Sequence, residues 1–483
     1  MADDPLDGVR TRFAPAPSGQ LHVGNVRTAL FSWATARRAS GTFILRVEDT
    51  DRSRVLDEYV EALQDDLRWL GIGWDEGPIR QSGRQEHYDA ALATMLGNGS
   101  AYRAFDTPEE LAAQREDAAA RKVAWRYDGS RWKALSAEES AAKAATDPFV
   151  VRFAMPPGST TFTDLVRGDV TVEHTEIGDF ALTRNDGAPL YYLAATVDDV
   201  LMGLTHIVRG EDLLMATPRQ MAMYAALGHP RDRWPQFAHV PLIMGEDGKP
   251  LSKRNESASL SWYRTQGFLP EAVLNYLCQL GWSMPDGREQ FGADEFVAAF
   301  SLDRVQRNAA RFDLKKLEAL NGDWIRSLPL EDLEARVLAA LVDADVAHDV
   351  AVVRRLLPEL ASRLKRLTEA PGLLAPLLSG PGGVALDPDD ALALLTAEAV
   401  ALLDLAITTL EGVTPWESEP ILDALRGALD AAGLKPKKVF PLLYLAVLGK
   451  RAGYPLTSAM EVIGREESLA RLRTARDRAA STG

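Results

Sequence analysis

The sequence has little cysteine and no long hydrophobic stretch. Cys278 is the single cysteine among 483 residues, which excludes an intramolecular disulfide and a cysteine-rich zinc site. No apolar run reaches the roughly 20 residues that cross a bilayer, and the opening MADDPLDGVR has no signal-peptide pattern. We therefore expect a cytoplasmic protein without a membrane partner, with Cys278 in AVLNYLCQLGW as a core residue.

Basic residues are fewer than acidic ones. The chain has 54 Lys and Arg against 69 Asp and Glu, and this net charge of −15, taken alone, argues against a nucleic-acid partner. The segment from Lys435 to the C-terminus reverses the balance, with ten basic and four acidic residues. The local excess of six has two interpretations: a solvated helix face, or a surface that meets RNA phosphates.

What the sequence does contain is a change of pattern along its length. Up to about residue 75, β-rich runs (VRTRFAP, TFILRVED) alternate with amphipathic helical patterns, which is typical of parallel βαβ units. The alternation returns with THIVRGED and QFAHVPLIM, so we expect one sheet completed from both sides of an insertion at residues 101–187. Beyond about residue 326, amphipathic patterns with Gly and Pro breaks predict an all-α region.

The stretch RFAPAPSGQLHVGN, residues 12–25, places a proline-stiffened turn between a predicted strand and a predicted helix. In a doubly wound sheet such a turn lies where ligands bind, because it presents backbone N–H groups and the positive end of a helix dipole. His22, Gly24 and Asn25 are therefore candidate nucleotide-binding residues, since glycine permits close backbone approach and the other two can donate hydrogen bonds. On these residues alone, a capping role for His22 is the commoner case.

A basic turn follows the returning strand pattern more than two hundred residues later. GEDGKPLSKRNESASL places Lys253 and Arg254 just after HVPLIM. Lysines in turns are usually only solvated charges. Two cations at the nucleotide edge of a sheet, however, would stabilise a departing polyphosphate as negative charge shifts onto it.

These two turns make the chain resemble the class I aminoacyl-tRNA synthetases, and specifically the bacterial glutamyl-tRNA synthetases. HVGN is similar to the family's HIGH-type signature, and LSKR is similar to its KMSKS-type loop. Further stretches follow in the family's order: TRFAPAPSG, LRVEDTDRSR, LRWLGIGWDEGP, AYRAFDTPEEL, DLVRGDV, HIVRGEDLL, QFAHVPLI, VLNYLCQLGW and RFDLKKLEALN. The resemblance covers nearly the whole chain.

The resemblance implies a two-step reaction and a set of site residues. Glutamate and ATP with Mg²⁺ give glutamyl-adenylate and pyrophosphate, and the acyl group then passes to the terminal adenosine of tRNA. The residues that match the family's glutamate site are Arg12, Ala14, Glu48, Tyr191 and Arg209. The residues that match its ATP site and catalytic groups are His22, Gly24, Asn25, Lys253 and Arg254. An arginine fork suits a carboxylate and an acid suits an ammonium group, although Glu48 in EDTDRSR is also an acid that a helix start favours.

The resemblance also implies a layout and partners. We expect a Rossmann-type catalytic domain in two parts (1–100 and 188–250), an acceptor-stem insertion of α+β type (101–187), a connecting subdomain with the KMSKS-type loop (251–325) and an all-helical anticodon-binding domain (326–483). Lys437, Lys438 and Tyr444 are the expected tRNA contacts, and Trp416 or Phe440 stacks on a base or belongs to the core. The expected partner of this monomer is tRNA(Glu), and tRNA(Gln) stays open.

Several positions depart from the family's pattern. Ala16 and Ala195 stand where polar residues of the amino-acid site are usual, Pro250 stands where a lysine precedes LSKR, and Tyr444 stands where an arginine faces the anticodon. AYRAFDT also lacks the cysteines that bind zinc in some relatives, so no zinc and no metal-binding side chains are expected. Two alternatives therefore stay open: a specialised paralogue with another substrate or a self-resistance role, and a catalytically inactive tRNA-binding protein.

Overall fold

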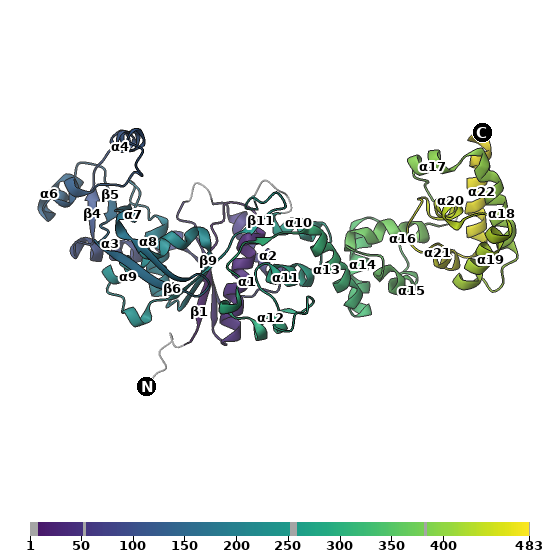
Figure 1. The fold of residues 1–483 in the computed structure, drawn as a ribbon, viewed down its shortest axis with the longest axis horizontal. Helices are drawn as coiled ribbons and strands as arrows, with labels where there is room; N and C mark the ends of the chain where they lie inside the picture. Colours follow the sequence, from purple (N-terminus) through teal and green to yellow (C-terminus); the bar gives the residue numbers. More distant parts are fainter. Residues whose placement is uncertain (1–7, 52–54, 252–257, 381–383, 483) are drawn as a thin grey trace. The chain divides into compact units, whose positions relative to one another are not determined.

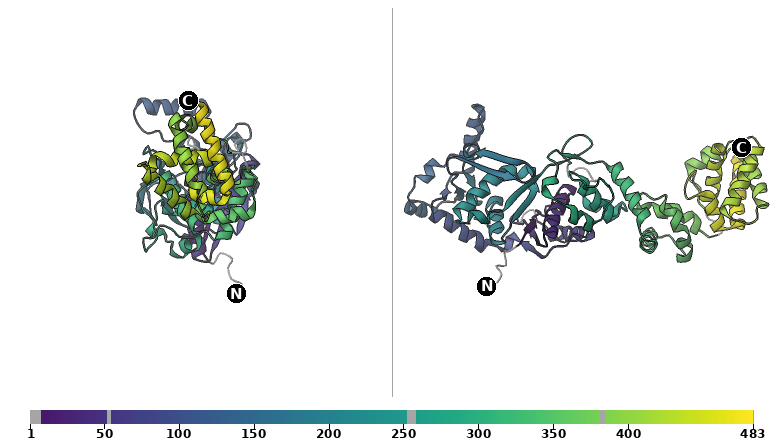
Figure 2. Two further views of the ribbon diagram at one scale, coloured as in Figure 1. Left: turned by 90° about the vertical axis from the view of Figure 1, so that its right-hand side faces the viewer. Right: turned by 60° about the horizontal axis from the view of Figure 1, so that its bottom comes forward.

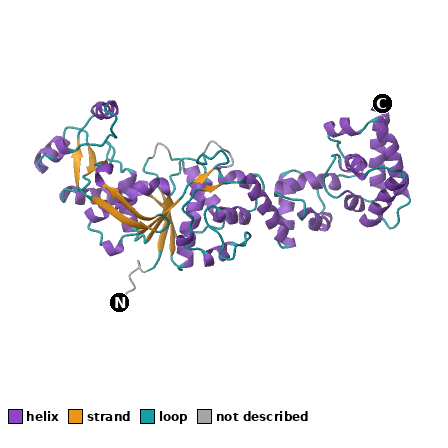
Figure 3. Ribbon diagram, in the orientation of Figure 1, coloured by secondary structure: helices purple, strands orange, loops and turns teal. Residues whose placement is uncertain are grey.

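The computed structural model describes residues 8–51, 55–251, 258–380 and 384–482. The chain forms two compact units, one made of Met1–Tyr263 with Val273–Asp313 and the other of Arg264–Ala272 with Leu314–Gly483. The first unit mixes strands and helices, whereas the second is helical (Figure 1, Figure 3). The α/β fold class with an all-α C-terminal half, predicted from the sequence, is confirmed.

A parallel sheet in the order β1-β2-β3 begins the first unit. Its strands and connecting helices are β1 (Arg10–Phe13), α1 (Val23–Arg38), β2 (Thr42–Val47), α2 (Asp57–Trp69) and β3 (Glu76–Arg80). β1 and β2 are buried along nearly their whole length, as expected for parallel strands that are covered on both faces. This is the βαβ arrangement that the alternating pattern predicted.

A second sheet has the order β7-β6-β10-β9. Its strands are β6 (Ser159–Asp164), β7 (Gly168–Glu173), β9 (His206–Gly210) and β10 (Gln236–Val240), and two helices, α8 (Tyr191–Leu201) and α9 (Thr217–Ala226), belong to the same stretch of chain. β10 runs parallel to both β9 and β6. The antiparallel hairpin of β6 and β7, which lies within the expected insertion, therefore extends the sheet of β9 and β10.

The expected single sheet is wrong, because β1 and β9 lie side by side without forming a ladder. The N–H of Thr205 donates to the carbonyl of Arg10 at 3.0 Å. The carbonyl of Val208, in contrast, accepts from the side chains of Arg12 (3.1 Å) and Ser32 (3.5 Å). Buried side chains take the place of backbone partners here, so two sheets meet at a seam.

Residues 101–181 also carry a small antiparallel sheet in the order β4-β5-β8, whose last strand follows the β6-β7 hairpin along the chain. Its elements are β4 (Ala101–Ala104), α4 (Pro108–Ala120), α5 (Ser130–Lys133), α6 (Ala137–Ala144), β5 (Val150–Phe153), α7 (His174–Ile177) and β8 (Phe180–Ala181). Phe105, Tyr127 and Trp132 form part of its core. Asp106, in the stretch where some relatives carry zinc-binding cysteines, accepts hydrogen bonds from the Tyr127 hydroxyl and from Trp132 Nε1 (2.8 Å for Trp132). A carboxylate among aromatic rings thus organises this segment.

α3 (Gln85–Gly97) lies between β3 and β4 along the chain. The elements that follow the second sheet are β11 (Ile243–Met244), α10 (Leu260–Thr265), α11 (Pro270–Gln279), α12 (Ala293–Ala299) and β12 (Ala310–Arg311). Cys278, in α11, is fully buried, which confirms its prediction as a core residue. Burial raises the pKa of its thiol, so it remains protonated at neutral pH.

The second unit is built from helices, which Figure 2 shows in green to yellow. They are α13 (Leu314–Ser327), α14 (Leu330–Asp343), α15 (Val350–Ala361), α16 (Ala370–Leu378), α17 (Pro388–Leu394), α18 (Ala397–Glu411), α19 (Ser418–Ala431), α20 (Pro436–Leu448), α21 (Leu456–Ile463) and α22 (Arg465–Thr482). α18 packs along α22. Gly449 ends α20 with φ of 80°, and a Cβ there would lie 2.4 Å from the carbonyl oxygen of Ala385, so a larger residue is excluded.

No single helix within the described ranges is both long and apolar enough to cross a membrane. α17 and α18 meet the criteria of length and composition only together, as a pair bent by 91°.

Candidate active site

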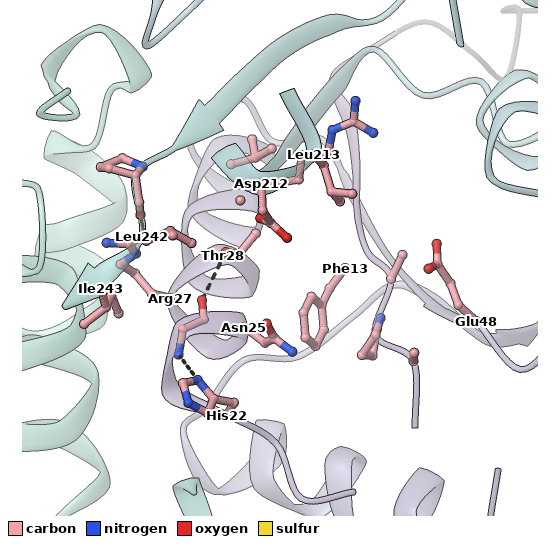
Figure 4. A pocket seen from close by; sticks show the side chains of 18 of the residues that line it. Phe13, His22, Asn25, Arg27, Thr28, Glu48, Asp212, Leu213, Leu242 and Ile243 are labelled. Atoms are coloured by element: carbon pink, nitrogen blue, oxygen red, sulfur yellow. Dashed lines mark hydrogen bonds between the residues drawn. The ribbon is translucent and has the colours of Figure 1, made fainter. Parts of the chain in front are cut away.

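A cavity of about 360 Å³ lies between β1, the start of α1 and the ends of β2 and β9 (Figure 4). Its wall contains every expected small-molecule site residue that the structure describes: Arg12, Ala14, His22, Gly24, Asn25, Glu48, Tyr191 and Arg209. Two expected residues, Lys253 and Arg254, lie outside the described residues. Segments almost 200 positions apart in the sequence thus converge on one cavity.

The helix-start end of the cavity is organised by His22. Its side chain caps α1, because Nδ1 accepts a hydrogen bond from the N–H of Gly24 at 3.1 Å. The capping interpretation is therefore confirmed, and it also fixes the tautomer: in the neutral ring the proton resides on Nε2. A Cβ at Gly24 would lie 3.3 Å from His22 Nδ1, which is tight, so glycine suits this turn. Asn25 is exposed beside them on the same turn.

Arg27 is a site residue that the sequence reasoning missed. It is 2% exposed, lines the cavity and donates hydrogen bonds to the carbonyls of Leu280 (3.0 Å) and Pro241. Burial lowers its pKa to about 10, opposed by Glu211, so Arg27 stays positively charged at neutral pH. The signal was present in the sequence, because this arginine occupies the apolar stripe of an amphipathic helix between Val23 and Leu30.

The opposite end of the cavity is built around two arginines. Arg12 reaches it from β1, and its Nε lies 3.9 Å from Asp199 Oδ1. Arg209 reaches it from β9 and donates to Tyr191 Oη at 3.3 Å. Burial raises the pKa of Tyr191 despite the nearby Arg209, so the phenol is protonated at neutral pH and can donate a hydrogen bond.

Arg209 is held by neutral side chains. Its Nε donates to His239 Nε2 at 2.9 Å, its Nη1 to Gln220 Oε1 at 2.7 Å, and its Nη2 to Thr217 Oγ1 at 2.9 Å. All three partners are fully buried. Because none of them carries a negative charge when His239 is neutral, they orient the guanidinium without neutralising it.

A buried ion pair supports this end of the cavity, and the sequence reasoning missed it too. Arg46 Nη1 lies 2.8 Å from Asp199 Oδ1, with both side chains fully buried, and Arg46 Nη2 lies 3.5 Å from Glu48 Oε1. Burial opposes the charge on Arg46, but Asp199 and Glu48 more than offset it, so its pKa is raised. Burial raises the pKa of Glu48, which Arg46 and Arg12 oppose.

The formal charges at this end do not cancel. Arg12, Arg46 and Arg209 supply three positive charges, whereas Glu48 and Asp199 supply two negative ones, which leaves an excess of one positive charge among these five side chains. A third carboxylate, Asp164, reaches Arg209 only through His239 among the described contacts. Of this set, the side chains of Arg12, Arg209 and Glu48 line the cavity, so two guanidinium groups and one carboxylate are placed to bind a ligand that carries carboxylate and ammonium groups.

The departures from the family's pattern lie in different surroundings. Ala16 is an exposed residue at the cavity wall, and Pro250 also lines the cavity. Ala195 is 2% exposed within α8 and is absent from the described cavity lining. Tyr444 lies on α20 in the helical unit, where its hydroxyl accepts a hydrogen bond from the N–H of Leu456 at 3.3 Å.

The expected tRNA contacts Lys437 and Lys438 are exposed near the start of α20. The excess of six basic residues counted from Lys435 onwards is not the charge of this region in the fold. Four of the ten basic residues lie within 4 Å of acids from α17 and α18: Lys438 with Glu398, Arg451 with Asp390, Arg473 with Glu411 and Arg476 with Asp404. Subtracting these four acids from the excess of six leaves two, so the basic surface is weaker than the count along the sequence implied.

Trp416 and Phe440 both pack against the core of the helical unit. Trp416 donates its Nε1–H to the carbonyl of Met460 at 2.8 Å. The contacts of these two rings therefore agree with the core interpretation.

Comparison with known proteins agrees with this geometry. Residues 8–319 match the family model for the catalytic domain of class I tRNA synthetases (E and Q), and residues 330–476 match that for an anticodon binding domain. A glutamate–tRNA ligase of a Nocardioides species is 44% identical over 97% of this chain and 98% of its own length. The chain belongs to the glutamyl-tRNA synthetase family. Glutamate–tRNA ligases of Rhodococcus jostii (42% identical) and Mycobacterium marinum (44%) match over 97% and 98% of this chain, and over 98% and 99% of their own lengths.

Solved structures of glutamyl-tRNA synthetases also match the fold. The glutamate–tRNA ligase of Elizabethkingia meningosepticum, in complex with its amino acid, has a TM-score of 0.84 and 30% identity over 97% of this chain and 99% of its own. The enzyme of Elizabethkingia anophelis gives 0.83 and 30% over 98% of this chain and all of its own. The family membership expected from the sequence motifs is therefore confirmed, and the alternatives of a specialised paralogue and of an inactive tRNA-binding protein are not favoured.

Proposed function

We propose that this chain is a glutamate–tRNA ligase that forms glutamyl-adenylate and transfers the glutamyl group to tRNA(Glu). One observation carries the choice of amino acid: the excess positive charge among Arg12, Arg46, Arg209, Glu48 and Asp199. L-glutamate at pH 7 has two carboxylates and one ammonium group, so its net charge of about −1 complements this excess. Neutral glutamine would leave the buried positive charge unpaired.

The residues at the arginine end of the cavity bind different groups of the amino acid. Arg12 and Arg209, with the Tyr191 hydroxyl, hold carboxylate oxygens through N–H and O–H donors. Glu48 holds the ammonium group, which in turn stabilises the charged form of this buried acid. Binding of glutamate therefore completes the charge balance of the pocket.

ATP fits the end of the cavity that lies at the start of α1. The start of α1 presents backbone N–H groups and the positive end of the helix dipole, and Gly24 has no side chain to keep a nucleotide away. His22 Nε2–H and the Asn25 amide donate to phosphate or ribose oxygens, and the buried Arg27 adds a positive charge. Mg²⁺ would come bound to the phosphates, since no group of three potential protein ligands occurs among the described residues.

Glutamate and ATP, bound at the two ends of the cavity, then react with each other. A carboxylate oxygen of the α-carboxylate of glutamate attacks the α-phosphorus of ATP, the bond to the β-phosphate breaks, and pyrophosphate leaves. By resemblance, Lys253 and Arg254, which lie outside the described residues, stabilise the charge that moves to pyrophosphate. A ribose hydroxyl of the terminal adenosine of tRNA then attacks the acyl carbon, and AMP departs.

The tRNA extends over the rest of the chain in this proposal. Residues 101–187 bind the acceptor stem, and residues 251–325 form the connecting subdomain. The helical unit binds the anticodon arm at α20 through Lys437, Lys438 and Tyr444. The match of residues 330–476 to an anticodon binding domain supports this assignment. We propose a cytoplasmic monomer that needs no zinc.

A charging assay tests the proposal. The purified chain, ATP, Mg²⁺ and labelled L-glutamate are incubated with tRNA(Glu), with tRNA(Gln), or without tRNA, and labelled glutamine replaces glutamate in a parallel series. We expect glutamate to be attached to tRNA(Glu) and no attachment of glutamine. Attachment of glutamine at a comparable rate, or no attachment of glutamate, would contradict the charge argument. The tRNA(Gln) reaction decides whether that tRNA is a second substrate.

A further inference from the structure

Arg209 belongs to a chain of contacts that ends on a different element. Asp164, the last residue of β6, is 2% exposed and His239, on β10, is fully buried. Asp164 Oδ2 lies 2.6 Å from His239 Nδ1, and His239 Nε2 accepts from Arg209 Nε at 2.9 Å. β6, β10 and β9 are consecutive strands of one sheet, so the three residues form a row across it.

The chemistry of this row determines where the proton of His239 resides. Arg209 Nε can only donate, so His239 Nε2 must carry the lone pair. The ring proton then sits on Nδ1 and is donated to the Asp164 carboxylate. Burial lowers the pKa of His239, and Arg209 lowers it further against the opposite effect of Asp164, so the ring is neutral at pH 7.

Asp164 is held in turn by backbone groups. Its Oδ1 accepts from the N–H of Val166 at 3.0 Å and of Arg167 at 2.8 Å, and the N–H of His239 donates to both of its oxygens at 3.2 and 3.1 Å. Burial raises the pKa of Asp164, but the hydrogen bonds from the His239 side chain and from the N–H groups of Arg167 and His239 more than offset it, so the pKa is lowered and the carboxylate is ionised. The carboxylate therefore has a fixed position and a fixed charge when it contacts the imidazole.

We infer that Asp164 and His239 are positioning residues for amino-acid recognition: Asp164 selects the His239 tautomer that accepts from Arg209 and thereby aims the guanidinium at the carboxylate of the substrate. This inference rests on the proposed glutamate site, because Arg209 lines that cavity while Asp164 and His239 do not appear in its described lining. Both act through Arg209 and neither touches the substrate.

Asp164→Asn is the variant that isolates this role. The carbonyl oxygen of the amide keeps the bonds from the N–H groups of Val166, Arg167 and His239 to Oδ1, and only the second bond of the His239 N–H, to Oδ2, is lost. The amide nitrogen then faces His239 Nδ1 and donates to it. The ring proton is forced onto Nε2, where it opposes the N–H of Arg209. The change alters the tautomer and removes one negative charge, while it keeps the size and burial of the side chain.

The test measures the KM for glutamate and the KM for ATP in tRNA(Glu) charging. We expect Asp164→Asn to raise the KM for glutamate by about ten- to hundredfold, the effect of one lost hydrogen bond to a charged group, with the KM for ATP changed by less than about threefold. Asp169→Asn is the matched control, because it makes the same change on β7, where Asp169 accepts only from the exposed Thr163 hydroxyl among the described contacts.

A second variant gives an independent check. In His239→Gln, the amide oxygen can accept from Arg209 Nε whatever residue occupies position 164. We therefore expect Asp164→Asn to raise the KM for glutamate by less than about threefold in the His239→Gln background, against at least tenfold alone. Equal effects in both backgrounds would overturn the inference.

A spectroscopic measurement does not depend on activity. Histidine ¹⁵N signals of the whole wild-type chain, with His239 assigned from the His239→Gln spectrum, should show the neutral tautomer with the proton on Nδ1 at pH 7. A proton on Nε2 would overturn the inference, even if Asp164→Asn fails to fold. If the wild-type chain does not attach glutamate, the proposed function fails. If it does, and Asp164→Asn matches Asp169→Asn, only this inference fails.

Discussion

Replacement of Arg209 by lysine should separate charge from geometry in glutamate recognition. Arg209 donates four hydrogen bonds, to His239, Gln220, Thr217 and Tyr191, at 2.7 to 3.3 Å. Four of its five N–H groups are thus used, which leaves one on Nη2 for the substrate among the described contacts. A lysine keeps the positive charge, but its three tetrahedral N–H groups cannot reproduce this planar arrangement. One charge-assisted bond to the substrate carboxylate is lost, which costs about 1.5 to 3 kcal/mol.

That cost corresponds to a decrease of about 10- to 150-fold in kcat/KM for glutamate. The assay is tRNA(Glu) charging at varied glutamate and, separately, at varied ATP, where the KM for ATP should not change. Arg219→Lys on α9 is the control, since the Arg219 guanidinium lies over the rings of Tyr192 and Phe180 and is absent from the described cavity lining. A decrease of less than threefold in Arg209→Lys would refute the assignment of a geometric role.

Three further changes test other parts of the chain. Lys253→Ala, at a residue outside the described ranges, should slow glutamate activation by about two to three orders of magnitude, measured by pyrophosphate exchange with tRNA present; a loss below tenfold would remove this lysine from catalysis. Lys437→Glu with Lys438→Glu should flatten the dependence of tRNA affinity on salt by about 0.7 in log–log slope per contact, and an unchanged slope would indicate a solvated surface. Burial opposes the charge on Glu271, but its two hydrogen bonds from Arg336 (2.6 and 3.0 Å) lower its pKa below 4.5. The pair therefore stabilises the helical unit above pH 4.5, and this stabilisation is lost as the pH falls through the folded-state pKa of Glu271. Glu271→Gln should lower the urea midpoint at pH 7, and this difference should narrow in acid; a difference independent of pH would contradict the ion-pair explanation.

The fold was predictable because it depends on local patterns. Alternation of β-rich and amphipathic stretches predicted the βαβ units, and the absence of strand-like runs beyond residue 326 predicted the helices of the second unit. The seam between the sheets was not predictable in this way. It depends on side chains of Arg12 and Ser32 that bond the carbonyl of Val208, and no local pattern reports a partner nearly 200 residues away.

The same distinction between local and long-range features applies to the candidate site. Residues in contiguous motifs, such as His22 and Glu48, could be placed by resemblance. The pair of Arg46 and Asp199 spans 153 residues, and each member looks like an ordinary charge in its own segment. Its only sequence signal was an arginine inside the apolar run TFILRVED. The basic excess after Lys435 was overestimated for the same reason, because acids from α17 and α18 come close only in the fold.

The long-range contacts of Arg12, at the seam, and of Arg27, on α1, have a consequence for how the protein is made. The side chain of Arg12 finds its carbonyl partner 196 residues further along, and Arg27 finds its two partners 214 and 253 residues further along. At translation rates of about 5 to 20 residues per second, the first β-strand and helix therefore wait roughly 10 to 50 seconds on the ribosome before these partners exist. During that interval the two arginines must stay hydrated, which keeps the amino-terminal segment open until the second sheet has been synthesised. The order of synthesis thus makes the amino-acid pocket one of the last features of the catalytic unit to assemble.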